Sequence, residues 1–362
     1  MASGFKSIWK LFMADMRNDH GIEIRGLSKI FGPNAHQLAP LLDQGITKSE
    51  LNEKHGHVLG LKDINISMSA GCIQVIMGLS GSGKSTLIRH INRLIDPTRG
   101  EVLVGSEDVV KMSPRELREF RRHKTAMVFQ KFALLPHRNV LENTVYGLEI
   151  QGVPRNRQVD AAMHWIERVG LSGFEKSYPN QLSGGMQQRV GLARALSNDA
   201  PILLMDEAFS ALDPLIRVDM QTILLELQKE IRKTIVFITH DLDEALRLGD
   251  RIAILRDGEV IQQGTAQEIV LTPADDYIMS FVEHVNRGKV VQVDTIMTPL
   301  HEGQVPQGGV TIMQGTLLED AAREMLSAGS DRLTVVSADG APIGSLSLQK
   351  LMSAMVRSDK AA

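Results

Sequence analysis

A short glycine-rich segment constrains this 362-residue chain more than any other part of its sequence. The segment fits the pattern G-x-x-x-x-G-K-[ST], in which backbone N–H groups converge on one phosphate. It consists of Gly78, Leu79, Ser80, Gly81, Ser82, Gly83, Lys84, Ser85 and Thr86. The apolar residues 72–77 before it predict a buried strand, and residues 85–92 after it predict a helix whose N-terminal dipole favours negative charge. The sequence therefore predicts a loop that binds the phosphates of a nucleotide.

The residue types of this loop suit phosphate chemistry. The glycines lack a Cβ, and this absence lets the backbone close around an anion. Lys84 adds a positive charge for the outer phosphates, and Ser85 offers its hydroxyl to Mg²⁺.

Three more apolar runs each end in polar or charged side chains. Near-continuous apolar runs of this length are typical of parallel strands covered on both faces. Ligands bind beyond the carboxyl ends of such strands. We therefore expect the side chains that follow these strands to converge on the phosphates held by residues 78–86. They are Gln130 after residues 125–129, Asp206 and Glu207 after residues 201–205, and His240 after residues 234–239.

These strand-end side chains suit magnesium binding and water activation. Asp206 is expected to help hold Mg²⁺, mostly through the water shell that this ion keeps. Glu207, one residue further out, is expected to polarise an attacking water. Gln130 can complete the metal or water coordination, and His240 can contact the outer phosphate or hold the water in line with Glu207. Ser85, Gln130 and Asp206 thus form the predicted metal set, and Gln130, Glu207 and His240 form the predicted catalytic set.

A second phosphate-binding turn is predicted at residues 183–185. Ser183, Gly184 and Gly185 begin an amphipathic helical pattern, and a serine followed by glycines suits a phosphate at a helix N-terminus. The chain thus has two such turns but a single strand-end acid pair. A head-to-tail homodimer explains this arrangement, because each nucleotide would lie between residues 78–86 of one copy and the second turn of the other.

The first predicted strand leads into an insertion. Residues 22–28 alternate between apolar and polar, as strands do. Phe31 follows them and serves either as a stacking platform for a nucleobase or as a core or turn side chain. Residues 33–57 are the insertion, in which Thr47 and Glu50 make a capping-box pattern. Its histidines lack metal-site spacing and are expected to be solvated; they are His36, His55 and His57.

The remaining patterns divide the chain into an α/β domain and smaller parts. Residues 22–288 predict the α/β domain, with a helical subdomain at about residues 131–190. Residues 289–356 predict a small α+β domain of order βαββα. Residues 1–21 carry an amphipathic helix that we expect to pack on its own domain or a partner subunit rather than on a membrane surface. Residues 357–362 are expected to form a flexible tail.

Hydropathy and charge exclude several classes of protein. No apolar stretch reaches the roughly 18 residues that cross a bilayer. The charges interspersed among residues 1–19 do not fit a secretory signal. The net charge of −3 gives no bulk attraction to nucleic acid. We therefore expect neither a membrane span nor a nucleic-acid partner.

Together these motifs resemble the nucleotide-binding subunit of ATP-binding cassette (ABC) transporters. The resemblance covers residues 22–285 and includes the signature at residues 182–186 and the segment 210–213. The commonest family signature ends in Gln, whereas this one ends in Met186. The resemblance implies a P-loop NTPase fold of the ABC ATPase type with an inserted helical subdomain. It also implies ATP and Mg²⁺ as cofactors and places Asp213 near the nucleotide.

A closer resemblance is to the ATPase subunits of importers for glycine betaine, proline and related quaternary amines such as choline. It rests on the insertion after Phe31 and on residues 77–83, 182–196 and 205–217. The resemblance implies an ATP hydrolase that works as two copies of this chain with two membrane permease subunits and an external solute-binding protein. The implied location is the cytoplasmic face of the membrane, with residues 131–146 receiving the permease.

The alternative is a soluble ABC-type ATPase that acts on nucleic acid or ribosomes. Such proteins usually carry two cassettes in one chain or a long coiled-coil insertion. Neither pattern is visible in this sequence.

The domain at residues 289–356 resembles a single cystathionine-β-synthase (CBS) motif. Members of that family normally pair two such motifs. Regulation and dimerisation are therefore both open as roles for this domain.

Overall fold

The structure is a computed structural model of the chain, and it describes residues 20–300 and 309–356. The helix predicted within residues 1–21 and the tail predicted at residues 357–362 thus lie outside the described residues, apart from the last two positions of the former. The chain divides into two compact units, Met1–Gln263 and Gly264–Ala362. The boundary predicted at residue 289 stays a prediction.

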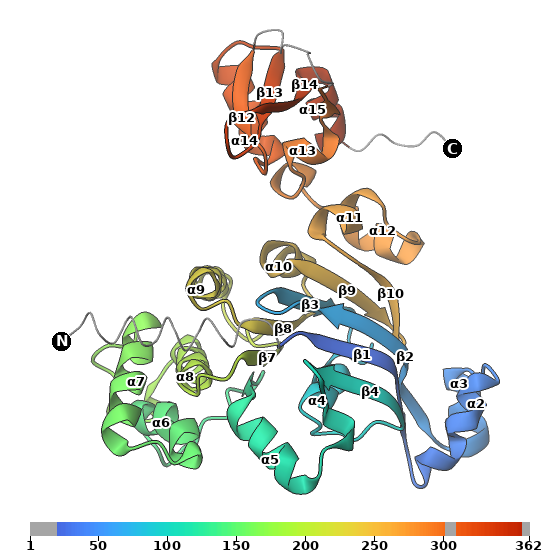
Figure 1. The fold of residues 1–362 in the computed structure, drawn as a ribbon, viewed down its shortest axis with the longest axis vertical. Coiled ribbons are helices and arrows are strands. Elements are labelled where there is room, and N and C mark those ends of the chain that lie inside the picture. The colour runs from blue at the N-terminus through green and yellow to red at the C-terminus, as the bar shows by residue number, and fades with distance from the viewer. Residues whose placement is uncertain (1–19, 301–308, 357–362) are drawn as a thin grey trace. The chain divides into compact units, whose positions relative to one another are not determined.

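Two sheets form the first unit (Figure 1). A six-stranded sheet has the order β10-β9-β3-β8-β7-β6, and the pairs from β9 to β6 are parallel. A four-stranded antiparallel sheet has the order β2-β1-β4-β5. The strands are β1 (Ile22–Phe31), β2 (Val58–Met68), β3 (Ile73–Met77), β4 (Arg99–Val104), β5 (Glu107–Asp108), β6 (Thr125–Val128), β7 (Ile202–Asp206), β8 (Thr234–Thr239), β9 (Arg251–Arg256) and β10 (Glu259–Gly264).

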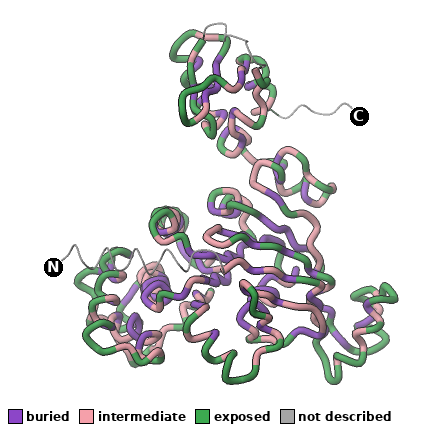
Figure 2. The backbone as a smooth tube through the Cα atoms, in the orientation of Figure 1, coloured by how far each residue is buried: buried purple, intermediate pink, exposed green. Residues whose placement is uncertain are grey.

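Helix α4 (Lys84–Ile91) begins directly after the glycine-rich loop and is packed into the main core. Its Leu87 and Ile91 are fully buried in one cluster with side chains of both sheets, among them Ile24 of β1 and Val236 of β8. Figure 2 shows this buried layer running through the central strands. Packing against both sheets fixes α4, and with it the loop, near the carboxyl ends of the parallel strands.

Several helices pack around the sheets of this unit. Three of them pack on one another beside β6: α6 (Val140–Gln151), α7 (Arg155–Arg168) and α8 (Gly184–Ser197). The apolar face of α7 accounts for this packing, since Ala162 and Ile166 are fully buried. Helices α5 (Pro114–His123), α9 (Pro214–Ile231) and α10 (Leu242–Leu248) also belong to this unit.

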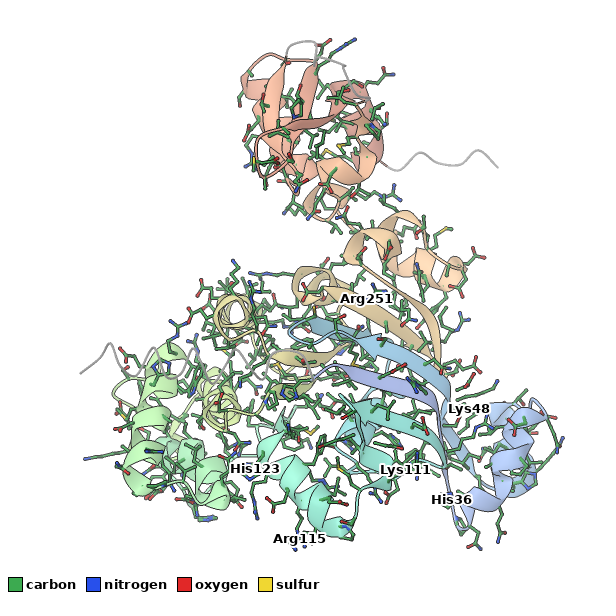
Figure 3. All side chains as sticks on the ribbon, in the orientation of Figure 1. His36, Lys48, Lys111, Arg115, His123 and Arg251 are labelled. Atoms are coloured by element: carbon green, nitrogen blue, oxygen red, sulfur yellow. The ribbon has the colours of Figure 1, made fainter. Side chains whose placement is uncertain are left out.

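The insertion between β1 and β2 folds around a small core of its own. It contains a 3-10 turn (Ala35–Leu38), α2 (Ala39–Asp43) and α3 (Lys48–His55), and Figure 3 labels His36 and Lys48 on it. Thr47 and Glu50 form the predicted capping box of α3.

The prediction that His57 is solvated is wrong. The residue is only 8% exposed. Its Nδ1 lies 2.6 Å from the carbonyl oxygen of His55, and its Nε2 lies 2.7 Å from that of Pro33. These carbonyl groups come from the two ends of the insertion, so its folding surrounds the ring.

The second unit holds a four-stranded sheet of order β11-β14-β13-β12, in which β12 and β13 are parallel. From β12 onward the element order is the expected βαββα. Buried Leu318, Met325 and Leu351 give the unit its own core. Its elements are α11 (Ala266–Leu271), α12 (Asp276–Val282), α13 (Val293–Ile296), β11 (Thr298–Pro299), β12 (Val310–Met313), α14 (Leu318–Ser327), β13 (Arg332–Val336), β14 (Pro342–Ser347) and α15 (Leu348–Met355).

Candidate nucleotide-binding site

The glycine-rich loop joins β3 to α4 and holds three glycines with positive φ. The φ angles of Gly78, Gly81 and Gly83 are 154°, 79° and 102°, in a region that other L residues rarely adopt. A Cβ on Gly83 would lie 2.8 Å from the carbonyl oxygen of Gly60, whereas a Cβ on Gly81 would meet no atom within 4 Å. Among the described residues, no side chain caps the start of α4. The space beside Gly81 is therefore open next to a helix N-terminus that favours an anion.

Two buried polar side chains of the loop fit a phosphate. The Lys84 side chain is 4% exposed, and its Nζ donates to the carbonyl oxygens of Gly78 at 2.7 Å and Leu79 at 2.9 Å. Burial lowers the pKa of Lys84, and the nearby Glu207 carboxylate opposes that shift. The Ser82 hydroxyl is buried and has no hydrogen-bond partner within the described ranges. A bound phosphate would supply the acceptor that Ser82 lacks and a charged partner for Lys84.

Strand β7 ends at Asp206, which is buried beside α4. The Ser85 hydroxyl donates to its Oδ1 at 2.8 Å, and a guanidinium nitrogen of Arg89 lies 3.3 Å from its Oδ2. Hydroxyl and carboxylate oxygens are ligands that Mg²⁺ accepts, so these residues fit that ion. Arg89 is not among the site residues predicted from the sequence. It lies four residues after Ser85, so the two side chains share one face of α4.

The Glu207 carboxylate is the meeting point of the predicted catalytic side chains. The Nζ of Lys84 and the Nδ1 of His240 each lie 3.7 Å from its Oε1, and the Nε2 of Gln130 donates to its Oε2 at 3.0 Å. The backbone of Glu207 has φ 46°, and its N–H donates to the carbonyl of Ile238 at 3.2 Å. Positive φ at a non-glycine residue is a conformation that proteins concentrate at functional sites. The structure thus gathers the side chains that follow the predicted parallel strands.

Phe31 ends β1 with 38% of its surface exposed. The Phe31 ring packs closely over Gly60, since a Cβ on Gly60 would lie 2.5 Å from Cε2 of the ring. The carbonyl oxygen of Gly60 in turn lies next to Gly83 of the glycine-rich loop. The Lys29 ammonium lies 5.2 Å from the ring centroid. The ring is therefore exposed and close to the loop, while its role in stacking stays a prediction.

The second predicted phosphate-binding turn lies elsewhere in the fold. Ser183 is the N-cap of α8, and its Oγ accepts a hydrogen bond from the N–H of Met186 at 3.3 Å. Gly185 lies against the start of α9, since a Cβ on it would be 2.7 Å from Cγ2 of Ile216. Asp213 is the N-cap residue of α9 and makes no capping bond with its side chain. In the part of the chain that the structure describes, no hydrogen bond or ion pair joins Ser183, Gly184, Gly185 or Asp213 to residues 78–86.

Comparison with known proteins places this site in a family. A family model described as ABC transporter matches residues 61–210. The glycine betaine transport ATP-binding protein OpuAA of Bacillus subtilis (strain 168) is 53% identical over 287 residues, which are 79% of this chain and 69% of the relative. The chain belongs to the ATPase family of ABC transporters. A second relative, the glycine betaine/proline betaine transport system ATP-binding protein ProV of Escherichia coli (strain K12), is 46% identical over 345 residues, or 92% of this chain and 85% of ProV.

A solved structure agrees with this assignment. The dimeric structure of MJ0796, a bacterial ABC transporter cassette, is 33% identical with a TM-score of 0.58, and the match covers 68% of this chain and 98% of that one. The likeness confirms the predicted P-loop ABC ATPase fold. The relatives confirm the predicted resemblance and do not favour the nucleic-acid alternative. No helix within the described ranges is long and apolar enough to span a bilayer.

Proposed function

We propose that this chain energises the import of glycine betaine, proline betaine or a related quaternary amine. The observation that carries the proposal is the likeness to ProV, which covers 92% of this chain and therefore must extend beyond the first compact unit, Met1–Gln263. The solute itself is selected by the other subunits of such an importer, so the proposal names a class of solute rather than one compound. Import of an amino acid such as proline or histidine is the runner-up within the same kind of assembly.

The gathered side chains have distinct roles in the proposed hydrolysis of ATP. The loop at residues 78–86 binds the phosphates, with Ser82 as hydroxyl donor and Lys84 as charge partner. Bound Mg²⁺ would supply positive charge to offset the negative charge that develops on the phosphate oxygens. Ser85, Asp206 and Gln130 are the residues that would hold this ion. Phe31 stacks on the adenine ring.

Glu207 orients the attacking water and accepts its proton. Gln130 Nε2 donates to one oxygen of this carboxylate, and Lys84 and His240 face the other. These contacts hold the carboxylate in one orientation, and orientation is most of what phosphoryl transfer requires of a protein. His240, whose side chain is 54% exposed, can turn toward the outer phosphate.

A second copy of the chain completes the site in this proposal. Ser183, Gly184, Gly185 and Asp213 have no described contact with residues 78–86 of their own chain, and the MJ0796 cassette forms a dimer. A head-to-tail pair places the second turn of each copy over the nucleotide of the other. The assembly also includes membrane permease subunits and an external solute-binding protein, with this chain bound peripherally at the cytoplasmic face.

The second unit is proposed to contain a single CBS-like domain. The βαββα order from β12 to α15 supports this assignment. Deleting residues 289–362 separates its two candidate roles. Loss of the response of transport to ionic strength would indicate regulation, and loss of self-association would indicate dimerisation.

The test of the proposed function uses the complete importer in lipid vesicles with ATP inside. We expect ATP-dependent uptake of labelled glycine betaine, and we expect Glu207→Gln to abolish both uptake and hydrolysis while leaving nucleotide binding intact. Gln keeps the size of the side chain but cannot accept the proton of the water. Normal hydrolysis by this variant would refute the role of Glu207, and hydrolysis without uptake of any quaternary amine would refute the solute class.

A further inference from the structure

Arg217, in the first turn of α9, connects the two chain segments that carry Glu207 and His240. One guanidinium nitrogen lies 3.2 Å from Oδ2 of Asp241, the residue after His240. The other donates to the carbonyl oxygens of Ser210 at 3.4 Å and Leu212 at 3.3 Å, just after Glu207. A planar guanidinium carries its donors on separate nitrogens in a fixed fork and can therefore bond acceptors in two segments at once, whereas a lysine donates from a single nitrogen.

Both segments are anchored tightly to the catalytic residues. Ser210 Oγ donates to the carbonyl of Glu207 at 2.9 Å and also lies 3.4 Å from Nε2 of Gln130. Asp241 uses its other oxygen, Oδ1, to accept the N–H of Glu244 and cap α10. A shift at either end of the Arg217 bridge would therefore move the backbone that carries Glu207 or His240.

The burial and hydrogen bonding of Arg217 differ from those expected of an arginine in a surface ion pair. Its side chain is 27% exposed, yet its Nε is buried and has no hydrogen-bond partner among the described residues. Leaving a buried donor unpaired costs free energy. The guanidinium is thus held at a position that satisfies the two segments rather than all of its own donors.

We propose that Arg217 is a positioning residue that keeps Glu207 and His240 in their relative geometry for ATP hydrolysis. This inference rests on the catalytic roles proposed above for those two residues. Arg217 touches neither of their side chains in any described contact, so its effect on the reaction is exerted through Ser210, Leu212 and Asp241.

A second arginine provides a matched control. Arg247 of α10 also bridges α10 and α9, with bonds of 2.8 Å to Oε1 of Gln221 and 2.8 Å to Oγ1 of Thr222. Its bonds are shorter than those of Arg217, but they reach neither of the two site segments. A general need for bridges between these helices would make Arg247→Ala at least as harmful as Arg217→Ala.

The experiment compares kcat, KM and ATP affinity in wild type, Arg217→Ala, Arg217→Lys, Arg247→Ala and Glu207→Gln. We expect Arg217→Ala to lower kcat by about tenfold to a hundredfold, as misplaced catalytic groups do, with ATP affinity unchanged. Arg217→Lys should recover part of kcat, and Arg247→Ala should keep the wild-type kcat. Asp241→Asn, which preserves the cap because Asn also caps helices, should add little to the loss in Arg217→Ala, since both variants break one bridge.

Several results would overturn the inference. They are a wild-type kcat in Arg217→Ala, an equal loss in Arg247→Ala, or loss of ATP binding in both Arg217 variants, which would assign the residue to folding. The Glu207→Gln variant distinguishes failure of the positioning role of Arg217 from failure of the catalytic roles in the proposed function. If Glu207→Gln is inactive while Arg217→Ala is normal, only the positioning role fails, and if Glu207→Gln is active, the catalytic roles fail first.

Discussion

Two glycines of the glycine-rich loop at residues 78–86 should respond very differently to the same substitution. Gly81 and Gly83 both have positive φ, so alanine at either position carries a backbone strain on the order of 1–2 kcal/mol. The strain is the larger at Gly83, because its φ of 102° lies further from the left-handed region than the 79° of Gly81. The added methyl group would meet open space at Gly81. At Gly83 it would lie 2.8 Å from both the Gly60 carbonyl oxygen and Cδ2 of Leu61.

The difference between the two variants contains the cost of this overpacking, and the larger backbone strain at Gly83 adds to it in the same direction. Forcing a methyl group into a filled space costs about 1–3 kcal/mol. The gain from restricting the unfolded chain is the same for both glycines and cancels. We therefore expect Gly83→Ala to lower the free energy of unfolding by about 1–3 kcal/mol more than Gly81→Ala does.

The assay is urea unfolding followed by circular dichroism, read from the transition that ATP shifts to higher urea in the wild type. Gly81→Ala should also bind ATP less tightly, since its methyl group would occupy the open space beside the loop. Equal unfolding free energies for the two variants would refute the described packing of Gly83 against Gly60. A larger loss in Gly81→Ala would refute it as well.

Three further predictions concern stability, pH and the nucleobase. Thr47→Ala should destabilise the insertion by about 0.5–2 kcal/mol in urea unfolding because it removes the capping box of α3, and Thr47→Ser should not. Burial lowers the pKa of His90 from 6.5 to about 4. As the pH falls between these two values, the unfolded chain therefore binds a proton that the folded chain does not, and the free energy of unfolding should drop by about 3 kcal/mol. Urea unfolding should show this drop in the wild type but not in His90→Gln. Phe31→Ala should weaken ATP binding by about 1–3 kcal/mol in calorimetry and leave tripolyphosphate binding unchanged, and equal losses for both ligands would contradict a stacking role.

The placement of the proposed catalytic side chains could be predicted from the sequence because it follows from strand geometry. Residues 125–129, 201–205 and 234–239 are apolar throughout, and such runs are typical of parallel strands. The carboxyl ends of parallel strands meet at one edge of a sheet. Gln130, Glu207 and His240 consequently meet at Glu207 in the structure.

The side chains that support this centre could not be predicted in the same way. Arg217 contacts Asp241, which lies 24 residues away, and Arg89 contacts Asp206, which lies 117 residues away. Both pairings depend on how α9 and α4 pack against strand ends. No local pattern in the sequence records the packing of α9, whereas the spacing of Arg89 from Ser85 gives only the face of α4 on which Arg89 lies.

The burial of His57 was missed for a related reason. Its ring is enclosed by carbonyl groups at the two ends of the insertion. Residue spacing alone reports on metal sites and helix faces, and it contains no signal for a ring that backbone carbonyls enclose. The capping box at Thr47 was predictable because all of its bonds lie within four consecutive residues.

In the proposed mechanism, each ATP site is built from two copies of the chain. The most direct test of this shared site is sedimentation of Glu207→Gln with and without ATP, beside Glu207→Gln carrying Ser183→Arg. We predict that ATP converts Glu207→Gln from monomer to dimer, and that the double variant stays monomeric although it binds ATP with unchanged affinity at residues 78–86. ATP-driven dimerisation of the double variant, or loss of its ATP binding, would contradict a site shared between Lys84 of one copy and Ser183 of the other.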